Sequence, residues 1–77
     1  MDLLDVAMGK WVRIIKIQGG AGLDQKLQSI GLMPGVTARI KRQAPFGGLV
    51  LLEVNGREIA LGRGIAEKVE VEEISVS

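Results

Sequence analysis

The sequence of 77 residues contains no cysteine, no histidine and no tyrosine. Without cysteine, neither a disulfide framework nor a thiolate metal site can form. Without histidine, the serine–histidine and cysteine–histidine catalytic pairs and imidazole metal sites are excluded as well. Aromatic residues amount to 3% of the chain, one tryptophan and one phenylalanine. With no base, nucleophile or metal set at a useful spacing, we expect a protein that is not an enzyme.

An excess of charge of one sign is also missing. The 10 basic and 9 acidic residues give a formal net charge of +1, without the basic excess of nucleic-acid-binding domains. The longest Leu/Val run, Leu49–Leu52, is far too short to span a bilayer, and the N-terminus lacks the basic start of a signal peptide. We therefore expect a single cytoplasmic domain over residues 1–77.

Apolar residues are abundant by contrast, at 47% of the chain. A domain of this length buries only about 60–65% of the surface that its unfolded chain exposes. We therefore expect some apolar surface to remain for a partner protein or for a homo-oligomer.

Residue patterns predict about five strands and one short helix. β-branched residues and alternation predict strands over residues 10–18, 36–42, 49–54, 57–61 and 68–76. Leu23, Leu27 and Ile30 fall on one face of a helix over residues 23–30. Asp5 is expected to cap a single turn over residues 6–8, and a second short turn is expected at 65–67. A phase slip in the first strand predicts a β-bulge or a strong bend, as in a small closed sheet. We therefore expect a mainly β fold, a small and strongly bent antiparallel barrel.

The segment I-G-L-M-P-G, residues 30–35, reads chiefly as a helix ending. Gly31 suits the position after the helix that requires a left-handed conformation, and Leu32 is then placed to contact Leu27 in a Schellman motif. Pro34 prevents the helix from continuing. Met33 has no structural role in this interpretation, so it is a candidate for contact with a partner.

A hairpin with an Asn55-Gly56 turn is predicted next. Its register pairs Leu51 with Ala60 and Glu53 with Glu58. One face of the hairpin carries core residues, whereas Leu49, Leu51 and Ala60 point away from that core, with Phe46 in the adjacent loop. This apolar strip is either a second small core under a helix or terminal segment, or a docking surface.

The opposed carboxylates of Glu53 and Glu58 cost about 0.2–1 kcal/mol unless they are compensated. A divalent cation between them is one interpretation, because hard metals prefer oxygen ligands. Neutralisation by Arg39 and Lys41 of the neighbouring strand is the other, and it requires no ligand. We favour the second, since two carboxylates without histidine form a poor transition-metal site. No cofactor is required by either the fold or the hairpin.

Taken in order, the turns of this chain resemble those of FeoA-type proteins. The matching residues are Leu27-x-x-Ile30-Gly31-Leu32-x-Pro34-Gly35, Ala44-Pro45-x-Gly47-Gly48, Asn55-Gly56 and Ile59-Ala60-Leu61. Leu49 stands where the family often has proline, and Gly62 where it often has arginine. The resemblance implies an SH3-like barrel, related to the C-terminal domain of iron-dependent repressors. It also implies a small cytoplasmic accessory protein of ferrous iron uptake.

The partner implied by this resemblance is a membrane ferrous iron transporter with a cytoplasmic G-protein region. The chain would reach the membrane only through that transporter. We expect the contact to use apolar residues left over from the core, namely Met33, Phe46, Leu49, Leu51 and Ala60.

Two other functions remain open at this point. One is a nucleic-acid-binding small barrel whose basic face and stacking platform are Arg13, Lys16, Arg39, Lys41, Arg42 and Trp11, although the near-zero net charge argues against nucleic acid. The other is a metal-sensing regulatory domain, as in a repressor, that binds an ion such as iron through Glu53, Glu58 or the acidic C-terminal strand.

Overall fold

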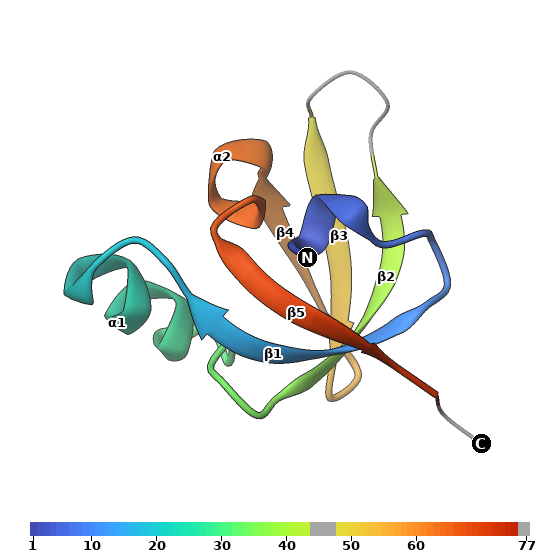
Figure 1. The fold of residues 1–77 in the computed structure, drawn as a ribbon, viewed down its shortest axis with the longest axis horizontal. Helices are drawn as coiled ribbons and strands as arrows, with labels where there is room; N and C mark the ends of the chain where they lie inside the picture. The colour runs from blue at the N-terminus through green and yellow to red at the C-terminus, as the bar shows by residue number, and fades with distance from the viewer. Residues whose placement is uncertain (44–47, 76–77) are drawn as a thin grey trace.

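The structure, a computed structural model, describes residues 1–43 and 48–75. Its elements follow the chain in the order shown in Figure 1: η1 (Leu3–Asp5), β1 (Trp11–Ile17), α1 (Ala21–Ser29), β2 (Thr37–Gln43), β3 (Leu49–Val54), β4 (Arg57–Gly62), α2 (Arg63–Ala66) and β5 (Val69–Ile74). The predicted mainly β fold is therefore confirmed. Within these residues, no helix has both the length and the apolar character needed to cross a bilayer.

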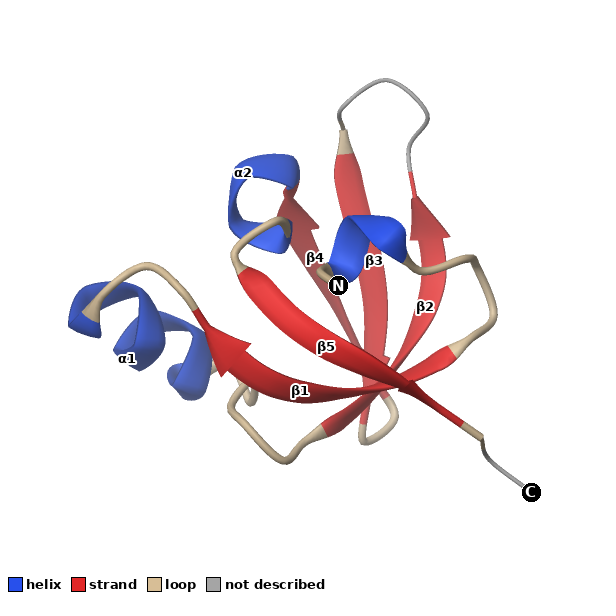
Figure 2. Ribbon diagram, viewed as in Figure 1, coloured by secondary structure: helices blue, strands red, loops and turns tan. Residues whose placement is uncertain are grey.

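The five strands form one antiparallel sheet in the order β4-β3-β2-β1-β5. The sheet bends so strongly that β1 and β5 run across the direction of β2, β3 and β4 in Figure 2. Sixteen apolar side chains are buried inside this bend, and among the described residues no polar or charged side chain is buried with them. The helix α2 overlaps the turn predicted at 65–67 but begins two residues earlier and ends at Ala66, which it buries. It joins β4 to β5.

Two β-bulges produce the bend. The register of β1 against β5 shifts between Ile14 and Lys16, so the phase slip corresponds to the first of its two expected causes, a β-bulge. As a result Ile14 and Ile17 are both buried, whereas Ile15 is 41% exposed. A second shift, between Ile40 and Arg42 in β2, was not predicted, because the alternation of that strand has no visible phase slip.

The helix α1 ends as predicted. The Leu32 N–H donates to the Leu27 carbonyl at 2.9 Å and the Gly31 N–H donates to the Gln28 carbonyl at 3.0 Å, which is the Schellman pattern. Gly31 has φ +96°, a left-handed conformation that suits glycine. The helix begins two residues earlier than expected, at Ala21, and Ile30 is 37% exposed because the helix has already ended there.

The turn predicted over residues 6–8 with Asp5 as its cap is wrong. The chain instead forms the 3-10 helix η1, and Asp2 is its N-cap. The Asp2 carboxylate accepts from the Leu4 N–H at 2.7 Å, and the Asp5 carboxylate accepts from the Asp2 N–H at 2.9 Å. This reciprocal capping box satisfies two backbone donors at once, and it also lets Leu3 reach the core.

The bulge in β2 has a structural consequence at the N-terminus. It turns Gln43 toward η1, where its side-chain amide donates to the Leu3 carbonyl at 3.1 Å and to the Val6 carbonyl. A side chain 40 residues away in sequence thus satisfies the carbonyls of the first residue of η1 and of its C-cap, Val6. A short helix leaves carbonyls such as these without partners inside the helix.

Replacement of Gly31 by alanine is expected to destabilise the fold. The new side chain would adopt an unfavourable left-handed backbone, and its Cβ would lie 2.7 Å from Arg57 Nη2, which donates to the Ile30 carbonyl at 3.4 Å. We expect Gly31→Ala to lower the free energy of unfolding by about 1–2 kcal/mol in urea denaturation. Gly22→Ala, inside α1 with open space around the new Cβ, is the matched control and is expected to raise it by about 0.5–1 kcal/mol. Equal effects of the two changes would contradict this account.

Replacement of Gln43 tests the link between β2 and η1. Gln43→Ala removes two hydrogen bonds to part-buried carbonyls and is expected to lower the free energy of unfolding by about 1–2 kcal/mol. Gln43→Glu is expected to lower it further, since a carboxylate accepts hydrogen bonds and cannot donate to these carbonyls. Urea denaturation monitored by circular dichroism measures both variants. If Gln43→Glu proved as stable as the wild type, the amide would not hold η1.

Candidate functional site

The outward side chains of the β3–β4 hairpin form a regular surface. Asn55 (φ +52°) and Gly56 (φ +80°) make the two-residue turn that the sequence predicts. The observed register confirms the expected pairs, Leu51 opposite Ala60 and Glu53 opposite Glu58. We call this surface the outer hairpin face, and its residues are Leu49, Leu51, Glu53, Glu58 and Ala60.

The apolar half of the outer hairpin face is accessible. Leu49 is 57% exposed, Ala60 is exposed and Leu51 is half-buried. Together with Arg42, which the β2 bulge brings opposite Leu51, they line an open hollow of about 280 Å³. The described part of the chain therefore forms no second core over Leu49. Phe46, the other candidate for this surface, lies outside the described residues.

Met33 lies in a different place from the outer hairpin face. It lines a hollow of about 370 Å³ between β1 and α1, and none of the residues around that hollow belongs to the hairpin. The structure thus separates the sequence-predicted contact residues into two surfaces. Ile15 shares the hollow with Met33 and was missed as a candidate, although the phase slip in β1 already indicated that one isoleucine of this strand would point outward.

The carboxylates of the outer hairpin face are only partly neutralised. Lys41 Nζ lies 3.9 Å from Glu53 Oε1, in agreement with one of the two expected contacts. Arg39 is opposite Glu53 in the register, yet its guanidinium lies over the Trp11 ring with Cζ 6.0 Å from the ring centroid. Within the described residues Arg39 forms no ion pair with Glu53, because the arginine packs against the aromatic ring instead.

The donor set of this pair does not fit a transition-metal ion. Glu53 and Glu58 offer two carboxylates, whereas such ions in proteins take imidazole or thiolate ligands as well. Across residues 1–43 and 48–75, no group of three or more acidic residues is placed to hold a metal. A third hollow, of about 250 Å³, is lined by Asp2, Asp5, Glu67 and Glu70 among other residues. Asp2 and Asp5 already accept hydrogen bonds in the capping box, and Glu70 accepts one from Gln18.

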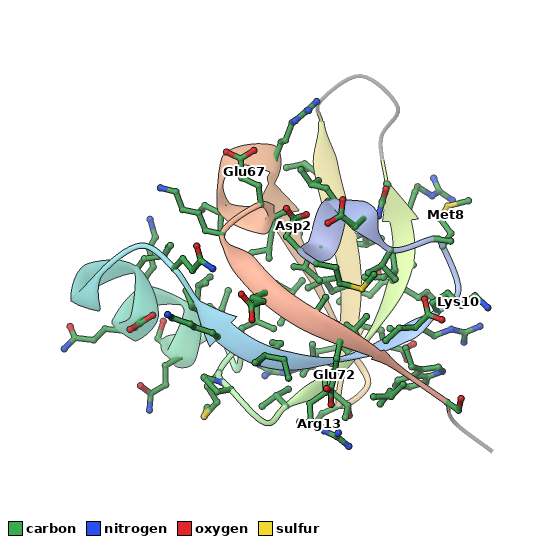
Figure 3. All side chains as sticks on the ribbon, viewed as in Figure 1. Asp2, Met8, Lys10, Arg13, Glu67 and Glu72 are labelled. Carbon is green, nitrogen blue, oxygen red and sulfur yellow. The ribbon has the colours of Figure 1, made fainter. Side chains whose placement is uncertain are left out.

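The basic residues considered for nucleic acid are largely engaged within the protein. Arg13 Nη1 lies 2.9 Å from Glu72 Oε1, and the two labelled side chains lie together in Figure 3. Lys41 lies beside Glu53, and Arg39 covers one face of Trp11. Arg39 therefore covers one face of the Trp11 ring, the expected stacking platform for a base. This arrangement does not favour binding of nucleic acid.

Comparison with known proteins gives a consistent family. Residues 1–73 match the FeoA domain. Over 65 residues the chain is 37% identical to a Methanocaldococcus jannaschii protein assigned the name Fe(2+) transport protein A, covering 84% of this chain and 77% of that one. The crystal structure of an iron uptake regulatory protein (FeoA) superposes with a TM-score of 0.86 at 31% identity, covering 96% of both chains.

A similar domain occurs inside a longer regulator. The manganese-activated repressor ScaR superposes with a TM-score of 0.87 at 30% identity, covering 96% of this chain and 35% of the repressor. These likenesses agree with the expected SH3-like architecture, and with the match over residues 1–73 they establish that the chain belongs to the FeoA domain family.

Proposed function

We propose that the chain is a non-enzymatic, cytoplasmic accessory protein of ferrous iron transport. It docks through the outer hairpin face onto the cytoplasmic G-protein region of a membrane ferrous iron transporter. The observation that carries this proposal is the exposure of Leu49 and Ala60 beside the half-buried Leu51, in a sheet whose inner face buries its apolar side chains. Membership in the FeoA domain family and a relative named for Fe(2+) transport support the transport context.

The outer hairpin face suits docking because its backbone is already ordered. Its residues lie on two strands that pair along their whole length, from Leu49 opposite Gly62 to Val54 opposite Arg57. A partner therefore orders few groups when it binds, and less of the favourable contact energy is lost to conformational entropy. Burial of leucine and alanine side chains then supplies the attraction, at about 25 cal/mol for each Å² of apolar surface removed from water.

The outer hairpin face has few side chains suited to catalysis. Its side chains are two leucines, an alanine and two carboxylates, with no nucleophile beside a base. We therefore assign it to contact and regulation of a partner, and not to proton or group transfer.

A metal-sensing domain of the repressor type is the second candidate, and the likeness to ScaR favours it. The donor set counts against it, because the described carboxylates do not form a group of three or more that could hold an ion. Calorimetric titration with ferrous and manganese ions distinguishes the two candidates. Saturable heat with one ion per chain would favour the sensor.

Replacement of Leu49 tests the docking surface. Leu49→Asp places a charge at the apolar end of the proposed contact, and we expect it to weaken binding to the purified cytoplasmic region of the transporter by at least about tenfold. Ile15→Asp is the matched control: it introduces the same charge at another exposed apolar residue, in the hollow that Met33 lines. Biolayer interferometry measures both affinities, and circular dichroism checks that both variants are folded.

Two results would contradict the proposal. Loss of binding by Ile15→Asp with full binding by Leu49→Asp would transfer the contact to the hollow between β1 and α1. Absence of any binding by the wild-type chain would refute docking on that region of the transporter.

A further inference from the structure

The acidic half of the outer hairpin face is short of positive charge. Glu53 and Glu58 lie directly opposite each other on β3 and β4. Side chains at such positions have Cβ atoms about 4.5–5.5 Å apart, so two carboxylates there repel each other. Lys41 approaches Glu53 only to 3.9 Å, and in the described chain Glu58 forms no ion pair. The pair thus retains capacity for one more cation.

Arg39, the arginine placed to neutralise the acidic pair, packs against Trp11 instead. Arg39 occupies the position opposite Glu53 on β2, and Trp11 is opposite Arg39 on β1. The guanidinium lies over the indole ring, 6.0 Å from its centroid, and the buried Arg39 Nε has no hydrogen-bond partner among the described residues. The fold therefore holds its nearest arginine away from the acidic pair.

The acidic pair lies one step along the strands from the apolar pair. Leu51 and Glu53 point outward from β3, and Ala60 and Glu58 point outward from β4, with one inward-facing residue between the members of each couple. Two strand residues span about 6.6–6.8 Å. The outer hairpin face therefore presents an apolar row and an anionic row at the spacing of alternate residues in an extended chain.

We infer that the outer hairpin face binds an extended segment of its protein partner in which a large apolar side chain and an arginine or lysine are two residues apart. This inference rests on the function proposed above and defines the chemistry of the contact. The apolar side chain packs over Leu49, Leu51 and Ala60. The cation enters between the carboxylates of Glu53 and Glu58, where an arginine can donate to both at once.

A side chain fits this place better than a free divalent ion. Two carboxylates without a third protein ligand hold an ion weakly, and no third acidic ligand is within reach in the described chain. An extended peptide, in contrast, delivers its cation together with an apolar side chain that the adjacent row can bury. The charge is thus held in place by the same chain that covers Leu49.

Stability and binding should respond to Glu58 in opposite directions. In the free protein, Glu58 repels Glu53, so Glu58→Gln is expected to leave the melting temperature unchanged or raise it. In the complex, Glu58 contacts the partner's cation, so the same change is expected to weaken binding by about tenfold. A residue that served only the fold would change both quantities in the same direction.

The test measures binding of Glu58→Gln to the purified cytoplasmic region of the transporter at low and at high salt. The matched control is Glu67→Gln, which removes the same charge at the exposed C-cap of α2. Glu67 lines a hollow with Asp2, Asp5 and Glu70, and no residue of the outer hairpin face lines that hollow. We expect wild-type affinity to fall with salt, Glu58→Gln to bind weakly with a reduced salt dependence, and Glu67→Gln to bind like the wild type.

A charge exchange completes the test. Synthetic peptides tiled across the cytoplasmic region identify the segment that binds, and its arginine or lysine is replaced by glutamate. We expect that peptide to lose binding to the wild type and to regain it with the double variant Glu53→Lys, Glu58→Lys. Full binding by Glu58→Gln while Leu49→Asp abolishes binding would overturn the inference and leave apolar docking intact. Absence of binding by the wild type would overturn both.

Discussion

Five short strands can enclose an apolar core only if their sheet bends sharply, and the bulges in β1 and β2 satisfy this constraint. The first bulge lets Ile14 and Ile17 both face inward and join the core, whereas Ile15 between them points outward. The second turns Gln43 toward η1 and brings Arg42 over the outer face. The core, the N-terminal helix and the surface next to Leu51 all depend on these two irregularities.

The β3–β4 hairpin contrasts with the bent strands because its pairing is unbroken. Strict alternation along β3 buries Val50, Leu52 and Val54 and leaves Leu49, Leu51 and Glu53 outside. The outer hairpin face is therefore a direct consequence of strand periodicity, with its apolar and acidic rows fixed in position by the buried residues between them. Because these rows are held in fixed positions, the face suits the proposed recognition of one partner segment.

Local chemistry made much of this structure predictable. The Asn55-Gly56 turn fixed the hairpin register, Gly31 and Leu32 specified the helix ending, and a phase slip revealed the bulge in β1. Contacts between distant segments were not predictable in this way. The Gln43 amide beneath η1 and the Arg39 guanidinium over Trp11 depend on which strands become neighbours, and no pattern within either strand specifies that. The separation of Met33 from Leu49 has the same cause.

The pairing of β1 with β5 also bears on how the chain folds. It joins residues 11–17 to residues 69–74, the largest sequence separation in the sheet, whereas β3 and β4 are joined by a two-residue turn. Closing a longer loop costs more chain entropy, so the hairpin can form early and β5 is expected to dock last. Substitutions in β5 should then accelerate unfolding more than they slow refolding, a difference that stopped-flow kinetics can measure. The hairpin that presents the proposed docking surface would thus be assembled before the barrel is complete.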